Sequence, residues 1–174
     1  IHFKPDPDIF ETTTFEFDIL ANRLRELAFL NKGLKIELED ERTDTTEVFH
    51  YKEGLKDFVK YLNSKKKPFH PPIYFKKEKG AIVLECVLQY NTSYSESLFS
   101  FANNINTHDG GTHVIGFRKA LTRTINAYAK DKGLLKNSKV SIQGDDTKEG
   151  LCAIVSVLLP NPQFEGRSEE HTSE

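Results

Sequence analysis

Four cationic side chains and no acidic one occur between Gly111 and Lys130. They are Arg118, Lys119, Arg123 and Lys130. Lys and Arg at this density attract phosphates, and such contacts position a nucleic acid without reading its bases. If all four contacted phosphates, the slope of log affinity against log salt would be about −3.6, from about −0.9 per contact. From these residues alone, an ordinary solvated helix face is the simpler alternative.

These cations belong to a predicted amphipathic helix that follows the diglycine Gly110–Gly111 and ends near Lys132. At 100° per residue, its apolar residues fall within about a quarter of the circumference. The predicted stripe consists of Val114, Phe117, Leu121, Ile125 and Tyr128. Lys119, Arg123, Asn126 and Lys130 fall on the opposite side. Arg118 lies at the edge of the stripe, where its stem can follow apolar surface and its guanidinium can emerge at the rim.

Other chemically interesting residues give weaker signals. Asp109–His113 could present backbone N–H groups to an anion, but it lacks the rest of a phosphate-binding loop, and His113 is expected only to form hydrogen bonds. Gly144–Asp146 could hold paired carboxylates, although a cap on the following turn is simpler. The six histidines lack metal-ligand spacing, and Ser, Cys and His form no nucleophile pattern. We therefore predict no catalytic residue, no bound cofactor and no metal site in this segment.

Length and composition fit one ordinary domain or parts of two smaller ones, since the chain has 174 residues. Its net charge of −2 means that any polyanion must be attracted by a local patch. No apolar run is long enough to span a bilayer and no signal-peptide pattern begins the sequence, so we expect a cytoplasmic protein. Cys86 and Cys152 sit in apolar runs, which favours buried reduced thiols.

Hydrophobic periodicity predicts an α+β fold with helices packed on sheet faces. A first helix begins near an Asp18 cap and ends near Gly33, and a second runs from Leu55 to Lys67. A hairpin is predicted between these two helices, over residues 34–51. Further strands are predicted at residues 73–77, 81–91, 95–105 and 151–159. We expect the strand at 95–105 to pair with the hairpin formed by the two strands before it.

Long sequence blocks resemble the B subunits of DNA gyrase, the ATPase subunits of bacterial type IIA topoisomerases. The blocks are LANRLRELAFLNKGLKIELEDERT, FHYKEGLKDFVKYLN, LQYNTSYSESLFSFANNINTHDGGTHVIGFRKALTR and GDDTKEGLCAIVSV. The resemblance extends from Ile1 to Gly166 and implies that residues 1–51 close a GHKL-type ATPase α/β sandwich. It implies that residues 52–166 form most of a transducer domain with the fold of ribosomal protein S5 domain 2. Residues 167–174 resemble a translated sequencing adapter, and we expect them to be a non-native tail.

The same resemblance implies a function for the parent protein. That protein would use ATP and Mg²⁺ to pass one DNA duplex through another and introduce negative supercoils. It would act with the gyrase A protein in a heterotetramer of two A and two B subunits, and its B subunits would dimerise on binding ATP. The family's ATP-binding residues would lie upstream of Ile1, so this segment alone is expected to be inactive.

For the cationic helix, the resemblance implies that Arg118 is the arginine lining the DNA cavity, with Lys119 and Arg123 as companions. Lys130 joins this predicted DNA-binding set by its position on the helix. The B subunit of topoisomerase IV, which decatenates DNA, shares the blocks and is one alternative, although LAFLNKGLKI favours gyrase. A stand-alone nucleic-acid-binding module of S5-like fold without ATPase is the other alternative.

Overall fold

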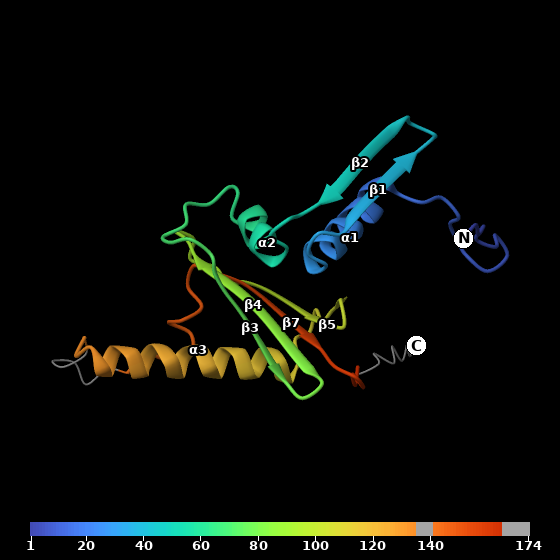
Figure 1. Cartoon of the computed structure of the whole chain (residues 1–174). Helices are drawn as coiled ribbons and strands as arrows, with labels where there is room; N and C mark the ends of the chain where they lie inside the picture. The colour runs from blue at the N-terminus through green and yellow to red at the C-terminus, as the bar shows by residue number, and fades with distance from the viewer. Residues whose placement is uncertain (135–140, 165–174) are drawn as a thin grey trace, which may run out of the picture. The chain divides into compact units, whose positions relative to one another are not determined.

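The computed structural model describes residues 1–134 and 141–164 (Figure 1). The predicted tail at residues 167–174 therefore lies outside the described residues. The chain divides into two compact units, Ile1–Tyr61 and the part from Leu62 onward. The predicted residue bounds of the two domains, 1–51 and 52–166, stay a prediction.

In the first unit, the helix α1 (Phe17–Leu30) packs on a hairpin of β1 (Lys35–Asp40) and β2 (Thr45–His50). Ala21, Ala28 and Phe49 form the buried centre of this packing. The predicted Asp18 cap is wrong, because the N-cap position is Glu16 and Asp18 lies within the first helical turn. An acid there still interacts favourably with the positive end of the helix dipole. The helix ends at Asn31, whose Nδ2 donates to the Leu27 carbonyl oxygen at 2.8 Å.

The second helix, α2 (Leu55–Leu62), is shorter than its sequence predicts. It buries Leu55, Phe58 and Val59, as the apolar spacing indicates. It stops before Asn63 because that side chain is 4% exposed and hydrogen bonded to two residues near the end of β4. A helix continuing to Lys67 would carry these bonds away from the strand.

The second unit contains a five-stranded sheet in the order β3-β4-β7-β5-β6. Its strands are β3 (Ile73–Lys79), β4 (Ile82–Tyr90), β5 (Ser97–Ala102), β6 (Ile105–Asn106) and β7 (Leu151–Leu158). The prediction that β5 pairs with the β3–β4 hairpin is wrong, because β7 lies between β4 and β5. All of β7 up to Val157 is buried, and a central position covers both faces of such an apolar strand. β5 and β7 are parallel and joined through α3 (Thr112–Asp131).

Both cysteines lie in this sheet, Cys86 on β4 and Cys152 on β7. They are free and buried, which confirms the prediction of reduced thiols. Burial raises the pKa of the Cys86 thiol to about 12 and that of Cys152 to about 11. Neither thiol is therefore a nucleophile near neutral pH. Within the described ranges, no helix combines the length and apolar character needed to cross a bilayer.

Candidate nucleic-acid interface

The start of α3 is set by its two preceding glycines. Gly110 has a φ of +83° and Gly111 a φ of +148°, which side chains rarely permit. A Cβ on Gly111 would also come 2.9 Å from Cε1 of His113. His113 Nε2 lies 3.2 Å from Thr107 Oγ1, and burial lowers the pKa of this imidazole. His113 is thus a neutral hydrogen-bonding residue near pH 7, as expected from the sequence.

The apolar stripe of α3 packs on one face of the sheet. Phe117 and Leu121 contact the buried cluster of Leu88, Leu151 and Ala153. The stripe ends earlier than predicted, because Tyr128 is 59% exposed. Figure 1 shows the C-terminal turns of α3, the part of the helix that carries this exposed ring, extending beyond the strands. The Tyr128 ring instead lies 6.0 Å from Lys132 Nζ.

Three of the predicted cations share the outer face of α3. Lys119, Arg123 and Lys130 are all exposed. At 100° per residue, the three side chains leave the helix axis within an arc of about 40°. We call these three residues the outer cations. The structure records no ion pair between these three and any carboxylate in residues 1–134 and 141–164. Their charges therefore face solvent together from one rigid helix.

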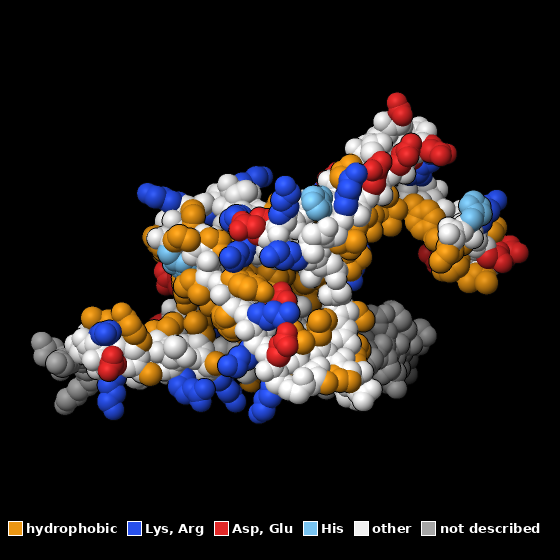
Figure 2. All heavy atoms as spheres, viewed as in Figure 1, with side chains coloured by type: hydrophobic (Ala, Val, Ile, Leu, Met, Phe, Trp, Pro, Cys, Tyr) orange, Lys and Arg blue, Asp and Glu red, His pale blue; other side chains and the backbone are white. Residues whose placement is uncertain are grey.

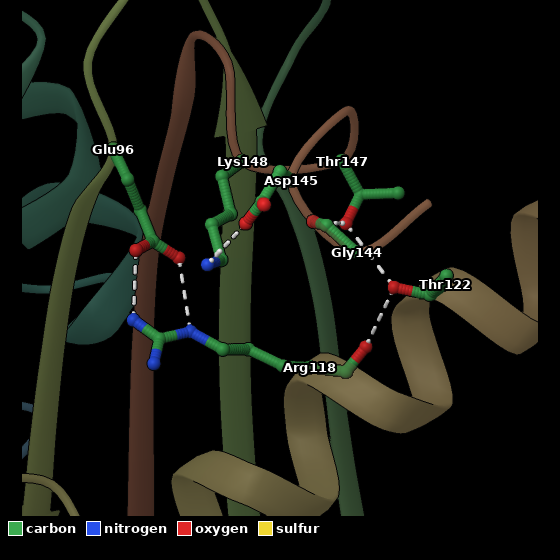
Figure 3. A network of polar contacts seen from close by, with 7 residues as sticks. All are labelled: Glu96, Arg118, Thr122, Gly144, Asp145, Thr147 and Lys148. Atoms are coloured by element: carbon green, nitrogen blue, oxygen red, sulfur yellow. Dashed lines mark hydrogen bonds and ion pairs between the residues drawn. The ribbon is translucent and has the colours of Figure 1, made fainter. Parts of the chain in front are cut away.

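The fourth predicted cation, Arg118, is held by an acid. Its Nε donates to Glu96 Oε1 at 3.2 Å and its Nη2 to Glu96 Oε2 at 2.7 Å (Figure 3). The Glu96 side chain is 18% exposed and that of Arg118 is 41% exposed, so the pair sits at the rim of the packed helix. A bidentate pair of this kind fixes the guanidinium plane and cancels its net charge. The structure thus separates Arg118 from the three outward-facing cations.

Glu96 is a site residue that sequence reasoning missed. It lies 22 residues before Arg118, immediately before β5, and no local pattern links the two. Only the packing of α3 on the sheet brings them together.

Side-chain hydrogen bonds clamp the middle of α3 to the segment before β7. Thr122 Oγ1 donates to the Arg118 carbonyl oxygen at 3.0 Å and lies 3.2 Å from Thr147 Oγ1 (Figure 3). Tyr90 Oη in turn donates to the Thr147 carbonyl oxygen at 2.8 Å. Asn126 Nδ2 donates to the Ile142 carbonyl oxygen at 2.7 Å. Asn126, predicted for the polar face, is thus half-buried and holds the helix in place.

The two carboxylates of the GDD sequence are engaged separately. Asp145 Oδ1 accepts from Lys148 Nζ at 2.7 Å, and this bond lowers the pKa of Asp145. Asp146 Oδ2 accepts from the backbone N–H of Gln143 at 2.7 Å. They form no paired-carboxylate site. No group of three metal-ligating side chains occurs in the part of the chain that the structure describes.

Comparison with known proteins identifies the family. The family model DNA gyrase B matches residues 54–171, more than half of the chain. The chain belongs to the DNA gyrase B family. It is 56% identical to the DNA gyrase B protein of Clostridium acetobutylicum and 52% identical to that of Halalkalibacterium halodurans. In each case the match covers 97% of this chain and 27% of the relative, so the chain spans about a quarter of those proteins.

Solved structures of gyrase B and of topoisomerase IV share the fold of this chain. The 43K ATPase domain of Thermus thermophilus gyrase B, crystallised with an aminocoumarin, has a TM-score of 0.82 and 40% identity. That match covers 94% of this chain and 45% of the other. The topoisomerase IV ATP-binding domain of Francisella tularensis has a TM-score of 0.76 and 28% identity, covering 95% of this chain and 44% of the other. These similarities confirm the expected α+β fold class of a GHKL ATPase end followed by an S5-like transducer.

Proposed function

We propose that this chain is part of the gyrase B component of an ATP-driven type IIA topoisomerase, and that the outer face of α3 lies against duplex DNA. Three exposed cations on one rigid helix, with no ion pair to a described carboxylate, are the observation that carries the DNA contact. Phosphate contacts of this type give affinity without sequence preference. That suits an enzyme that must move any duplex.

The parent protein would bind ATP and Mg²⁺, and its B subunits would close around DNA when ATP binds. It would work in the cytoplasm with the gyrase A protein, two copies of each, to introduce negative supercoils. The identity of 52–56% to gyrase B proteins favours gyrase over topoisomerase IV. No catalytic or cofactor-binding residue is proposed within this chain, which alone would be inactive.

The DNA contact is tested by changing Lys119, Arg123 and Lys130 to alanine together. We expect the magnitude of the log affinity against log salt slope to fall by about 2.7, from three contacts at about 0.9 each. Anisotropy of a short labelled duplex, measured over a salt series, gives this slope. A triple variant of the ion-paired Lys60, Lys76 and Lys148 is the matched control, since it changes the net charge equally. An equal loss of slope in both variants would contradict a local contact.

Arg118 provides a separate prediction, because Glu96 already neutralises it. Arg118→Ala should leave the salt slope nearly unchanged. Glu96→Gln should steepen it by about 0.9, since the guanidinium becomes free to meet a phosphate. The double variant should return to the slope of the unchanged chain, which a double-mutant cycle can establish. A clear loss of slope in Arg118→Ala alone would show that Arg118 contacts phosphate while still bound to Glu96.

A further inference from the structure

The β3 strand presents two lysines on the same side of the sheet as α3. α3 packs on the face that carries Leu88, Leu151 and Ala153. On β3, Ile73 pairs with Leu88, and Lys77 and Lys79 lie four and six residues further along. Because side chains alternate between faces with a period of two, both lysines project from the face that α3 covers in part.

These two lysines differ from their neighbour Lys76. Lys77 and Lys79 are exposed and form no ion pair with another residue in the described ranges. Lys76 projects from the opposite face, where its Nζ lies 3.3 Å from Glu78 Oε1 and 3.6 Å from Glu85 Oε1. The hydrogen bond to Glu78 and the charge of Glu85 raise the pKa of Lys76. On this strand, acids therefore neutralise the lysine on the far face and leave the two on the α3 face uncompensated.

The lysines of β3 and the outer cations of α3 face the same direction. The outer cations lie on the side of α3 away from the sheet, and Lys77 and Lys79 point away from the sheet on that same side. Figure 2 shows blue Lys and Arg side chains along the lower edge of this unit, beneath α3 and the β3–β4 hairpin. Duplex DNA carries a charge about every 1.7 Å along its axis, so a duplex lying along this side of the sheet would offer phosphates to both elements.

We propose that Lys77 and Lys79 extend the DNA-contacting surface of α3 onto β3, so that two elements of one unit hold the duplex backbone. This inference rests on the proposed DNA contact of α3. Contact through two separate elements restrains the direction of the duplex, which a row of cations on one helix does less well. Both sets contact phosphates only, so the surface orients DNA without sequence preference.

The test is a salt series of duplex binding by the Lys77→Ala/Lys79→Ala variant. We expect the slope to lose about 1.8 in magnitude, from two contacts. Between about 50 and 200 mM salt, the fall in affinity should then be about 12-fold smaller than for the unchanged chain. Lys77→Arg/Lys79→Arg should keep the original slope. Lys76→Ala, a control that removes one ion-paired lysine from the same strand, should also leave the slope unchanged.

The outcomes separate this inference from the proposed function. If the α3 triple variant lowers the slope and the β3 double variant does not, the inference is overturned and the α3 contact stands. If neither lowers it, both fail. Lysines on an edge strand can instead prevent sheet-to-sheet association. A β3 variant that self-associates with an unchanged slope would assign Lys77 and Lys79 that role and overturn the inference.

Discussion

Replacing Gly150 with alanine should destabilise the second unit by about 3–5 kcal/mol, because the new methyl group meets backbone on two sides. Gly150 has a φ of +69°, and an added Cβ would lie 2.4 Å from the carbonyl oxygen of Asn91 and 3.0 Å from that of Ser93. The backbones of Gly150 and Asn91 cannot move independently, since the Asn91 N–H donates to the Gly150 carbonyl oxygen at 2.9 Å. The two chain segments must therefore separate, which breaks the contact where β7 begins.

Gly80→Ala isolates the cost of the backbone conformation. Gly80 has a φ of +60°, but nothing lies within 4 Å of the Cβ position. Gly80→Ala should therefore lower the free energy of unfolding by only about 1–2 kcal/mol. Alkylation of Cys86 and Cys152 during urea unfolding measures the free energy of opening, because both thiols are buried in the second unit and the chain has no others. If Gly150→Ala and Gly80→Ala lowered the free energy of opening equally, the close approach of Asn91 would not be what constrains Gly150.

Asn63→Ala should destabilise the same unit by about 2–4 kcal/mol, since it leaves two buried polar groups without partners. Asn63 Nδ2 donates to Gln89 Oε1 at 2.7 Å, and Asn63 Oδ1 accepts from Asn91 Nδ2 at 3.0 Å. Asn63, Gln89 and Asn91 are all at most 4% exposed. Water cannot readily replace the lost amide in such a site, so each partner incurs a desolvation cost.

Gln143→Ala is the control for this change. Gln143 is exposed, and among the described residues its side-chain amide donates to Ser141 alone. Its removal should therefore change the free energy of unfolding by less than about 0.5 kcal/mol. Alkylation of Cys86 and Cys152 during urea unfolding again measures the change. If Asn63→Ala lowered the free energy of unfolding by less than about 1 kcal/mol, water would have access to the side chains of Gln89 and Asn91.

Both changes act on the end of β4 that also positions α3. Asn91 directly follows Tyr90, whose hydroxyl bonds to Thr147, and Thr147 contacts Thr122 on the helix. The Asn63 and Gly150 contacts thus support the same end of the sheet as the polar clamp on α3. Loss of either should loosen the surface that carries the outer cations.

Local sequence was enough to predict the main elements of the second unit. The spacing of Val114, Phe117 and Leu121 predicts the buried side of α3, and the same spacing places Lys119, Arg123 and Lys130 on the outer side. Helical periodicity depends only on residues within a few turns, so it can be read directly. Long blocks of similar sequence also indicated the family, because such similarity can be recognised without knowing any tertiary contact.

The tertiary structure decided what those elements contact. It placed β7 between β4 and β5, left Tyr128 exposed and turned Asn126 into a clamp. It also joined Arg118 to Glu96, which removes one predicted cation from the free set. Each of these outcomes joins residues that are distant in sequence, and their pairing is set by how apolar faces are buried together. Sequence thus determined which side of α3 carries charge, and only packing determined which of those charges remain uncompensated.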